Sequence, residues 1–492
     1  MSAAGLPQRA NPAPAGGSAA AKPQAWGRHA SVVATLALPK SRAPALARLG
    51  DFLRGHRRGV LALQWLVVAF YAVLVVVPAF LPLPPSGASI VSDLTLFAQF
   101  AFWGIWWPFV IASTMLFGRA WCGLFCPEGT LTEFASRHGL GRSIPRWMRW
   151  GGWPFTAFAL TTIYGQLVSV YEYPQAVLLV LGGSTVAAVA VGFVYGKGKR
   201  VWCRHLCPVN GVFALLAKVA PLHYRVDEDA WKRFTARAPS VDCAPLVDLR
   251  HMKSASPCHA CGRCSGHRDA IVLAARSPSR EILALKPADV HTSEALLLIF
   301  GVLGLAQAAF QWTVSPWFVA LEQSLARWLV EHDRLALLDN GAPWWLLTHY
   351  PQANDVMSWL NGLCIIGYLS AYALVVGSLT FAALAGAVRL AGGARFDWKT
   401  LAMALVPTGG VGLFLGLSML TLTQLRAEHV IVHADALRAG LLACALAWSA
   451  WLGARILRRG DAPRMRRGAA VPLYAVPLVL TGGAWWLVFW RW

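Results

Sequence analysis

Three cysteines follow one another in the stretch CHACGRC, at Cys258, Cys261 and Cys264. Thiolates with this C-x-x-C-x-x-C spacing hold iron–sulfur clusters, and a [4Fe–4S] cluster takes four of them. Where a ferredoxin-type pattern has its fourth cysteine, this sequence has Arg268, which is followed by Asp269 instead of proline. Either the stretch binds a different metal, or the fourth thiolate comes from elsewhere in the chain.

A second cysteine pattern occurs twice. The segments GRAWCGLFCPEG and KRVWCRHLCPVNG both read basic–x–Trp–Cys–x–x–x–Cys–Pro when Arg119 is matched to Arg200. The four cysteines of this repeat are Cys122, Cys126, Cys203 and Cys207. Two such loops together present four thiolates, the number that a [4Fe–4S] cluster needs.

The composition is that of an integral membrane protein. Of the 492 residues, 57% are hydrophobic and only 14% are charged, whereas soluble domains carry about 25% charged residues. Many of the apolar residues stand in runs of about 20, the length that crosses a bilayer as a helix. We predict an all-α polytopic fold with about nine transmembrane helices, at residues 60–81, 95–117, 152–170, 176–195, 293–312, 359–384, 401–422, 436–457 and 471–490.

The basic residues are unevenly distributed between the predicted loops. The net charge is +21, and 39 of the 44 Lys and Arg residues fall in loops on one face. This asymmetry is the positive-inside rule, so that face is cytoplasmic and the basicity indicates topology and not a nucleic-acid partner. We expect a multi-pass protein of a bacterial-type inner membrane, in contact with lipids, with the N-terminus and the cysteine motifs in the cytoplasm.

Eight of the ten cysteines lie in these cytoplasmic loops, and only Cys364 and Cys444 lie inside predicted spans. Clustered thiols that face a reducing compartment favour metal binding over disulfides. Cys243 is the one cytoplasmic cysteine outside the motifs, and the short loop that joins it to Cys258 closes easily. We predict one cluster on Cys243, Cys258, Cys261 and Cys264 and another on Cys122, Cys126, Cys203 and Cys207, with an exchange of the two Cys-Pro cysteines left open.

Two C-x-x-x-C-P loops at membrane edges, followed by a ferredoxin-like cytoplasmic segment, resemble the membrane polyferredoxins of the NapH, NosR and CcoG type. The resemblance covers about residues 60–290. It implies [4Fe–4S] clusters and electron transfer between the quinone pool and partner redox proteins, or support of oxidase and reductase maturation. The chain departs from the NapH pattern because it lacks two full C-x-x-C-x-x-C-x-x-x-C-P motifs, and it has four or five further spans after residue 290.

Histidines offer alternative ligands. His251, His259 and His267 stand in the same loop as the cysteines, and a Cys/His zinc site is the simplest alternative to a cluster. None of the predicted spans contains a histidine, so we expect no haem. On the outer side, His349, His429 and His433 could belong to a quinol site or a docking surface, or could simply cap loops.

Other basic and apolar features have two interpretations each. Arg204, Arg263 and Arg268 would offset the charge of thiolate-ligated clusters, or they are ordinary positive-inside residues. Glycines in PTGGVGLFLGL, in the seventh predicted span, indicate close helix packing, or they leave room for a bound cofactor.

We therefore predict four regions: a basic, largely disordered cytoplasmic tail at 1–58, two transmembrane hairpins at 59–200, a cytoplasmic ferredoxin-like segment at 201–291, and a C-terminal transmembrane module at 292–492. The predicted function is electron transfer through two [4Fe–4S] clusters between the quinone pool, or a membrane partner, and a redox partner protein. The alternatives are an accessory factor for assembly of a respiratory oxidase or reductase, and a zinc or iron–sulfur sensor.

Overall fold

Long apolar helices make up most of the computed structural model, which describes residues 45–85 and 87–492. Within these residues, eight helices are long and apolar enough to cross a bilayer. They are Arg57–Phe80, Leu94–Phe117, Pro174–Tyr195, Thr292–Ala309, Trp359–Ala391, Trp398–Ala427, Asp435–Leu457 and Arg464–Arg491. The predicted fold class, an all-α polytopic membrane protein, is confirmed.

Several of these spans are built from consecutive helical pieces. The α-helices within them are α2 (Arg57–Val76), α3 (Leu94–Gln99), α4 (Trp107–Phe117), α8 (Pro174–Val177), α9 (Gly183–Tyr195), α14 (Thr292–Leu296), α15 (Gln307–Ala309), α17 (Trp359–Ala391), α18 (Trp398–Ala402), α19 (Val406–Ala427), α20 (Asp435–Leu457) and α21 (Arg464–Trp486).

The predicted span at residues 152–170 is shorter than expected. It forms α7 (Trp153–Leu167), whose 15 residues extend about 22 Å, less than the bilayer core of about 30 Å. The helix ends where Ser169 takes a positive φ of 47°. Its two ends nevertheless lie beside the two ends of the Thr292–Ala309 helix, because Gly151 lies beside Ser293 and Gln166 accepts a hydrogen bond from Trp312.

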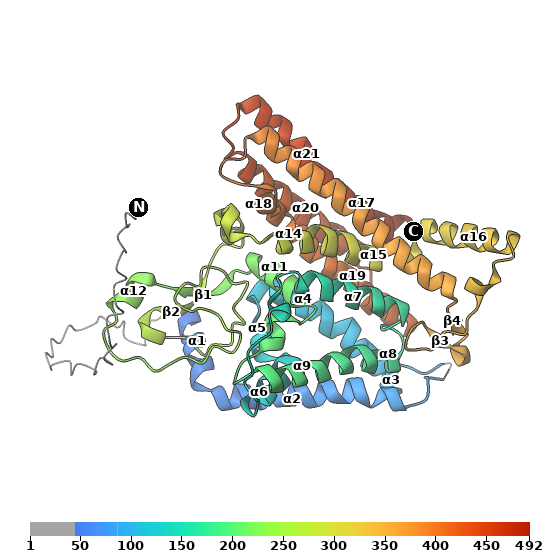
Figure 1. The fold of residues 1–492 in the computed structure, drawn as a ribbon, viewed down its shortest axis with the longest axis horizontal. Helices are drawn as coiled ribbons and strands as arrows, with labels where there is room; N and C mark the ends of the chain where they lie inside the picture. Colours follow the sequence, from blue (N-terminus) through green and yellow to red (C-terminus); the bar gives the residue numbers. More distant parts are fainter. Residues whose placement is uncertain (1–44, 86) are drawn as a thin grey trace, which may run out of the picture. The chain divides into compact units, whose positions relative to one another are not determined.

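The helix α19 is the centre of the bundle. In its span, 89% of the apolar stretch is buried, far more than in any other of the eight. It packs against α20, α21 and α4, and Figure 1 shows it between α17 and α21 on one side and α2 and α9 on the other. Both halves of the chain therefore share one core.

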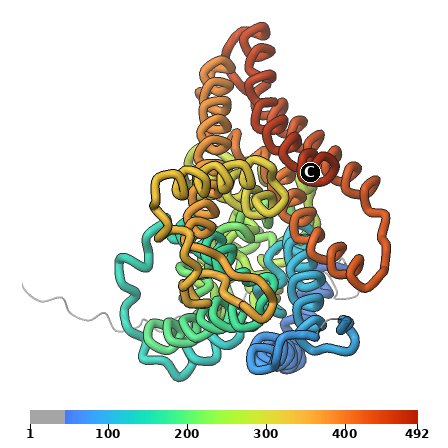
Figure 2. The backbone as a smooth tube through the Cα atoms, turned by 90° about the vertical axis from the view of Figure 1, so that its right-hand side faces the viewer, coloured from blue at the N-terminus to red at the C-terminus, as the bar shows by residue number. Residues whose placement is uncertain are grey.

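The cysteine-bearing segment and the loops that contain α16, β3 and β4 lie at opposite ends of the helices. At one end are α1 (Ala45–Gly55), α5 (Ala120–Leu124), α6 (Pro127–Arg137), α10 (Val201–His205), α11 (Asn210–Leu216), α12 (Glu228–Arg233), α13 (Arg280–Ala284) and the antiparallel strands β1 (Leu222–Val226) and β2 (Ile271–Ala275). At the other are α16 (Pro316–Glu331), β3 (His349–Tyr350) and β4 (Asp355–Val356), which face the viewer in Figure 2.

The predicted tail at residues 1–58 is only partly described. Residues 1–44 lie outside the described part of the chain, whereas residues 45–58 form α1 and the start of α2. The helix α1 packs against β2, with Gly50 directly over Ser265 and Leu273. Ser265 also donates a hydrogen bond of 3.0 Å to Asp51. This helix is therefore a structural part of the cysteine-bearing region.

Glycines of the PTGGVGLFLGL stretch allow close helix packing, as predicted. A Cβ atom on Gly416 would lie 2.7 Å from the ring of Phe310 and 2.8 Å from that of Trp485. A Cβ atom on Gly410 would lie 2.7 Å from the side chain of Met115 and 2.8 Å from that of Leu216. The helices could not approach to these distances if the positions carried side chains.

We expect Gly416→Val to lower the unfolding free energy in detergent by about 1–3 kcal/mol, the usual cost of overpacking a filled core. The matched control is Gly483→Val in α21, where a Cβ atom would meet nothing within 4 Å. Thermal unfolding followed by tryptophan fluorescence measures both. Equal midpoints for the two variants would contradict the close contact.

Candidate functional site: two groups of four thiols

The two C-x-x-x-C-P loops have the same backbone geometry. In each, a five-residue helix carries the first cysteine, Cys122 in α5 and Cys203 in α10. The amide of the second cysteine then donates to the carbonyl of the tryptophan five residues earlier, at 3.0 Å in both loops. The proline that follows Cys126 is the first residue of α6, a position where its missing N–H costs no hydrogen bond.

The four thiols of this repeat lie close to one another, with Cys122 and Cys203 buried and Cys126 and Cys207 half-buried. Burial, followed by the neighbouring Cys203 and Cys122 thiols, raises the pKa of Cys126. Burial also raises the pKa of Cys203 to about 12, and the Cys122 thiol adds to the shift. The pKa of Cys207 is raised by burial, by Glu128 and by the other three thiols. Metal binding to such a group releases protons, because only thiolates ligate.

Glu128 is a carboxyl group beside these thiols that sequence reasoning missed. Its two oxygens accept hydrogen bonds from Ser184 Oγ at 2.7 Å and from Trp202 Nε1 at 3.1 Å. Burial raises its pKa above the ordinary value. It links α6 to α9 and to the tryptophan of the second loop. Its position in the CPEG sequence, two residues after Cys126, was the available signal.

The second group of thiols lies in the loop that β1 and β2 close. The two strands pair Val226 with Ile271, so residues 227–270 begin and end at one point. Cys243, Cys258, Cys261 and Cys264 all line one small cavity in this loop. Gly262 and Gly266 have φ of 79° and 68°, a conformation that glycine adopts without strain. These turns coil the CHACGRCSG stretch so that its thiols converge.

Cys243 is positioned by the second C-x-x-x-C-P loop. The Arg200 amide donates to the Ala244 carbonyl at 2.8 Å, and Lys199 Nζ donates to the Cys243 carbonyl at 3.3 Å. Lys199 also pairs with Asp242. The residue that was selected as the fourth member of the group therefore lies beside the other three, although it stands outside their motif in the sequence.

Arg119 of the first repeat extends to the other two cysteine segments. Its guanidinium donates to the Ser256 carbonyl at 2.9 Å and to Asn210 Oδ1 at 2.7 Å. Asn210 begins α11, directly after the second C-x-x-x-C-P loop, and Ser256 precedes Cys258. This arginine is only 4% exposed, so it brings a permanent positive charge into the buried thiol region.

Arg200, which the repeat matches to Arg119, makes the reciprocal connection. It donates to the Cys122 carbonyl of the first repeat and pairs with Glu133 of α6 at 2.9 Å. Arg263, between Cys261 and Cys264, pairs with the same carboxylate at 2.7 Å. Burial alone would raise the pKa of Glu133, but Arg200 and Arg263 lower it to about 2. One carboxylate therefore joins all three cysteine segments.

The two groups of thiols share a direct contact. A Cβ atom on Gly123, next to Cys122, would lie 2.0 Å from the His259 carbonyl and 3.0 Å from Cys261. No side chain therefore fits between the first C-x-x-x-C-P loop and the CHACGRC loop. Gln64 of α2 fixes this position by donating to the Gly123 carbonyl at 2.8 Å.

The three histidines of the cysteine loop have different surroundings. His259 is buried at the thiol cavity, and burial followed by Arg119 and Arg200 lowers its pKa well below the ordinary value. His267 meets the ring of Trp231 edge to face, whereas exposed His251 forms a hydrogen bond of 2.7 Å with Asp248. Of the three, only His259 lies among the thiols.

The predicted arginines divide in the same way. Arg263 lines the thiol cavity. Burial, followed by Arg119, lowers the pKa of Arg204, whereas the nearby Cys243 thiol acts to raise it. Arg268 instead stacks over the ring of Trp231, 5.1 Å from its centroid.

His429 and His433 lie between two long helices, whereas His349 lies elsewhere. The helix α19 ends at Ala427, and α20 begins at Asp435, so His429 and His433 lie in the connecting loop. His429 has a φ of 60°, and its amide donates to the Arg426 carbonyl, which is the geometry of a helix end. His349 lies apart from them in the short β3 strand, paired with Val356.

The donor set fits an iron–sulfur cluster in both its chemistry and its surroundings. Among the described residues, no three His, Cys, Asp or Glu side chains lie close enough to hold a single metal ion. In a [4Fe–4S] cluster, each of four cysteines binds a different iron. The buried Tyr224 hydroxyl lines the second thiol cavity and has no partner in the described chain, and a cluster sulfide is an acceptor for it.

We expect Glu133→Gln to destabilise the protein by about 3–5 kcal/mol, because it leaves buried Arg200 without its counter-charge. In the wild type this carboxylate stabilises the fold fully above its unfolded pKa of about 4.5. That stabilisation is lost as the pH falls toward 2, where the folded-state pKa lies.

Unfolding midpoints in detergent between pH 7 and pH 3 test this expectation. The exposed Glu331→Gln serves as the control, since Glu331 forms no ion pair within the described residues. A Glu133→Gln variant as stable as this control at neutral pH would contradict the role of the carboxylate.

Comparison with known proteins agrees with this geometry. Residues 99–147 and 179–226 match the 4Fe-4S binding domain family, and each matched segment contains one C-x-x-x-C-P loop. The chain is also 25% identical over 184 residues to the regulatory protein NosR of Pseudomonas aeruginosa. This match covers 32% of the chain and 25% of NosR, so it spans about a quarter of that protein's length.

No solved structure matches the chain. The resemblance to membrane polyferredoxins that the sequence indicated is confirmed by the two matches. The protein is a membrane protein with a 4Fe-4S binding domain, similar to the NosR type of polyferredoxin.

Proposed function

We propose that this protein transfers electrons through two [4Fe–4S] clusters at the cytoplasmic face of the membrane. Cys122, Cys126, Cys203 and Cys207 bind one cluster, and Cys243, Cys258, Cys261 and Cys264 bind the other. Electrons pass between the quinone pool, or a membrane partner, and a redox partner protein. The domain match supports the iron–sulfur part of this proposal.

The observation that carries the proposal is the contact at Gly123. This glycine lies between Cys122 and Cys126 and touches the backbone of His259 and Cys261. Backbone therefore packs on backbone where the two thiol groups meet, with no side chain between them. Two redox centres held in this way exchange electrons with each other more readily than either does with a distant partner.

Two further features suit redox centres. When bound, a [4Fe–4S] cluster supplies one-electron chemistry, and its potential depends on nearby charge and solvent exposure. The chain contributes buried and half-buried thiols, and cations near both groups. Arg119 and Arg200 counteract the rise in the pKa of Cys203, and Arg119 does so for Cys258. These charges favour the thiolate forms and raise the potentials of the clusters.

An accessory role in the assembly or regulation of another metalloenzyme is the second candidate. One observation favours it: the NosR protein to which the chain is similar is named as a regulatory protein. In that case the same clusters would act as a sensor or would serve assembly, outside the electron path of the partner enzyme. The eight cysteines would remain the ligands in both cases. The two functions differ in whether the quinone pool supplies electrons to the clusters.

We expect Cys243→Ser to lose about half of the iron, from about eight to about four atoms per chain, because one of two four-thiolate sites loses a ligand. Iron and acid-labile sulfide analysis with anaerobic EPR measures this. The matched control is Cys364→Ser, a buried thiol within α17, which should keep the full content. Unchanged iron in the Cys243 variant would overturn the ligand assignment, and zinc in place of iron would overturn the clusters.

We expect a natural quinol to reduce the clusters of the anaerobic wild-type protein, because an electron carrier must react with its donor. Bleaching of the visible iron–sulfur absorbance follows the reaction. Protein that retains its clusters but reacts with neither ubiquinol nor menaquinol would contradict a quinol-linked carrier. Loss of one oxidase or reductase activity in a deletion strain, together with that result, would establish the accessory role.

A further inference from the structure

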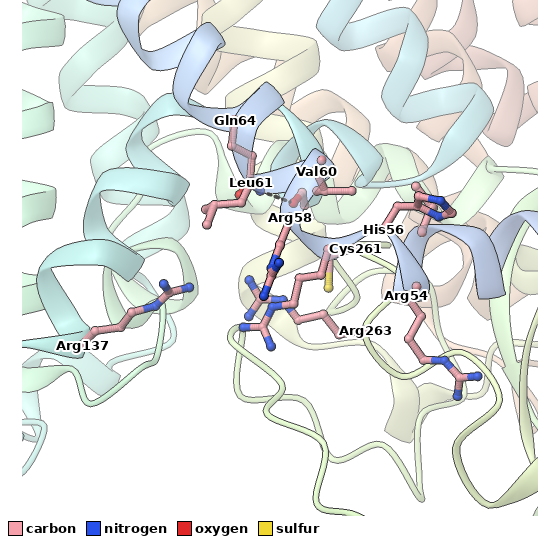
Figure 3. Close-up of a pocket in the computed structure, with 14 residues that line it drawn as sticks. Arg54, His56, Arg58, Val60, Leu61, Gln64, Arg137, Cys261 and Arg263 are labelled. Carbon is pink, nitrogen blue, oxygen red and sulfur yellow. Dashed lines mark hydrogen bonds between the residues drawn. The ribbon is translucent and has the colours of Figure 1, made fainter.

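A large cavity lined by arginines lies against the second thiol group. It encloses about 770 Å³ where α1 meets α2, and Arg54, Arg57, Arg58, Arg137 and Arg263 line it. No Asp or Glu is among the described residues of this lining. Figure 3 shows Arg58 and Arg263 close together near Cys261, with Arg137 and Arg54 on opposite sides. Such a concentration of guanidinium groups attracts an anion.

Two of the five arginines have no acidic partner. Arg137 and Arg263 both pair with Glu133, and Arg54 lies 3.8 Å from Asp51. Within residues 45–85 and 87–492, however, Arg57 and Arg58 form no ion pair, and residues 1–44 contain no Asp or Glu that could supply one. The cavity therefore keeps a positive charge that the chain does not neutralise.

The size and place of the cavity restrict its occupant. A volume of about 770 Å³ lies within the range of small-molecule sites, about 300–1,000 Å³, and is larger than one inorganic phosphate needs. Apolar Leu53, Val60 and Leu61 also line it. Because Arg57 is the first residue of a membrane span, the cavity stands at the level of the lipid headgroups.

Cys261 and Arg263 line both this cavity and the second thiol cavity. They form a common wall, so that an anion in the arginine-lined cavity lies against a residue of the second thiol group. We propose that the arginine-lined cavity binds a phosphate-bearing anion, either a soluble phosphate compound or an anionic phospholipid headgroup, and that this anion adjusts the potential of the adjacent cluster.

The consequence for the cluster has a definite sign. Reduction adds an electron, so a bound anion next to Cys261 disfavours reduction and lowers the midpoint potential of that centre. By linkage, reduction weakens the binding of the anion to the same extent. The effect on the midpoint potential rests on the proposed function, whereas anion binding itself requires no cluster.

The test uses Arg57→Gln/Arg58→Gln, which removes the two unpaired charges and leaves Glu133 with its partners. Its control is Arg48→Gln/Arg142→Gln, which removes two exposed arginines from the same predicted face outside the cavity. The paired removal keeps the positive-inside balance equal in both variants. Calorimetry with pyrophosphate in detergent tests the soluble source. Native mass spectrometry from nanodiscs of phosphatidylglycerol and phosphatidylcholine tests the lipid source.

We expect one of the two probes to bind the wild type and the control equally, and the cavity variant about tenfold more weakly or worse, since charge-assisted hydrogen bonds are lost. Binding of pyrophosphate identifies a soluble ligand, and selective retention of phosphatidylglycerol identifies a lipid. The site is overturned if neither probe binds the wild type, or if both variants bind alike. A cluster potential that the bound probe does not lower overturns the coupling while leaving the anion site intact.

Discussion

Two buried arginines, related by the internal repeat, hold the cysteine region together. The side chain of Arg119 extends from the first loop and donates to Asn210 and to the Ser256 carbonyl. The side chain of Arg200 extends from the second loop and donates to the Cys122 carbonyl of the first. The exchange is reciprocal, so neither loop can move without disturbing the other. Glu133 makes such burial of charge tolerable, because it compensates Arg200 and Arg263 together. The positions of all eight thiols depend on this arrangement.

The sequence predicted the membrane fold well because hydrophobic length is a strong local signal. Eight predicted spans are helices in the structure, whereas α7 is shorter because Ser169 ends it early. The sequence did not predict the helix α1, because residues 45–55 are basic and only weakly apolar. The helix forms a buried face only when it packs against β2. Its burial of Gly50 against Ser265 is a contact between distant parts of the sequence, which no local pattern reveals.

The cysteines were recognisable because their chemistry is tied to spacing, and Cys243 was assigned to its group by elimination. The supporting residues were not recognisable in the same way. Arg119 and Arg200 are indistinguishable in sequence from the other basic residues of the predicted cytoplasmic face, and only their matched places in the repeat set them apart. Glu133 has no motif at all. Its importance comes from three arginines that converge on it from different segments.

The packing of α1 on the CHACGRC loop also determines the order in which the protein can be assembled during synthesis. The ribosome makes α1 first and α2 follows it into the membrane, but Ser265 and Leu273, the residues under Gly50, are translated only after the first four predicted spans are complete. Arg200, which binds the first C-x-x-x-C-P loop, is translated earlier, whereas α1 has no partner to pack on until Ser265 and Leu273 have been made. The packing around the second thiol group can therefore be completed only after the chain has been translated up to β2.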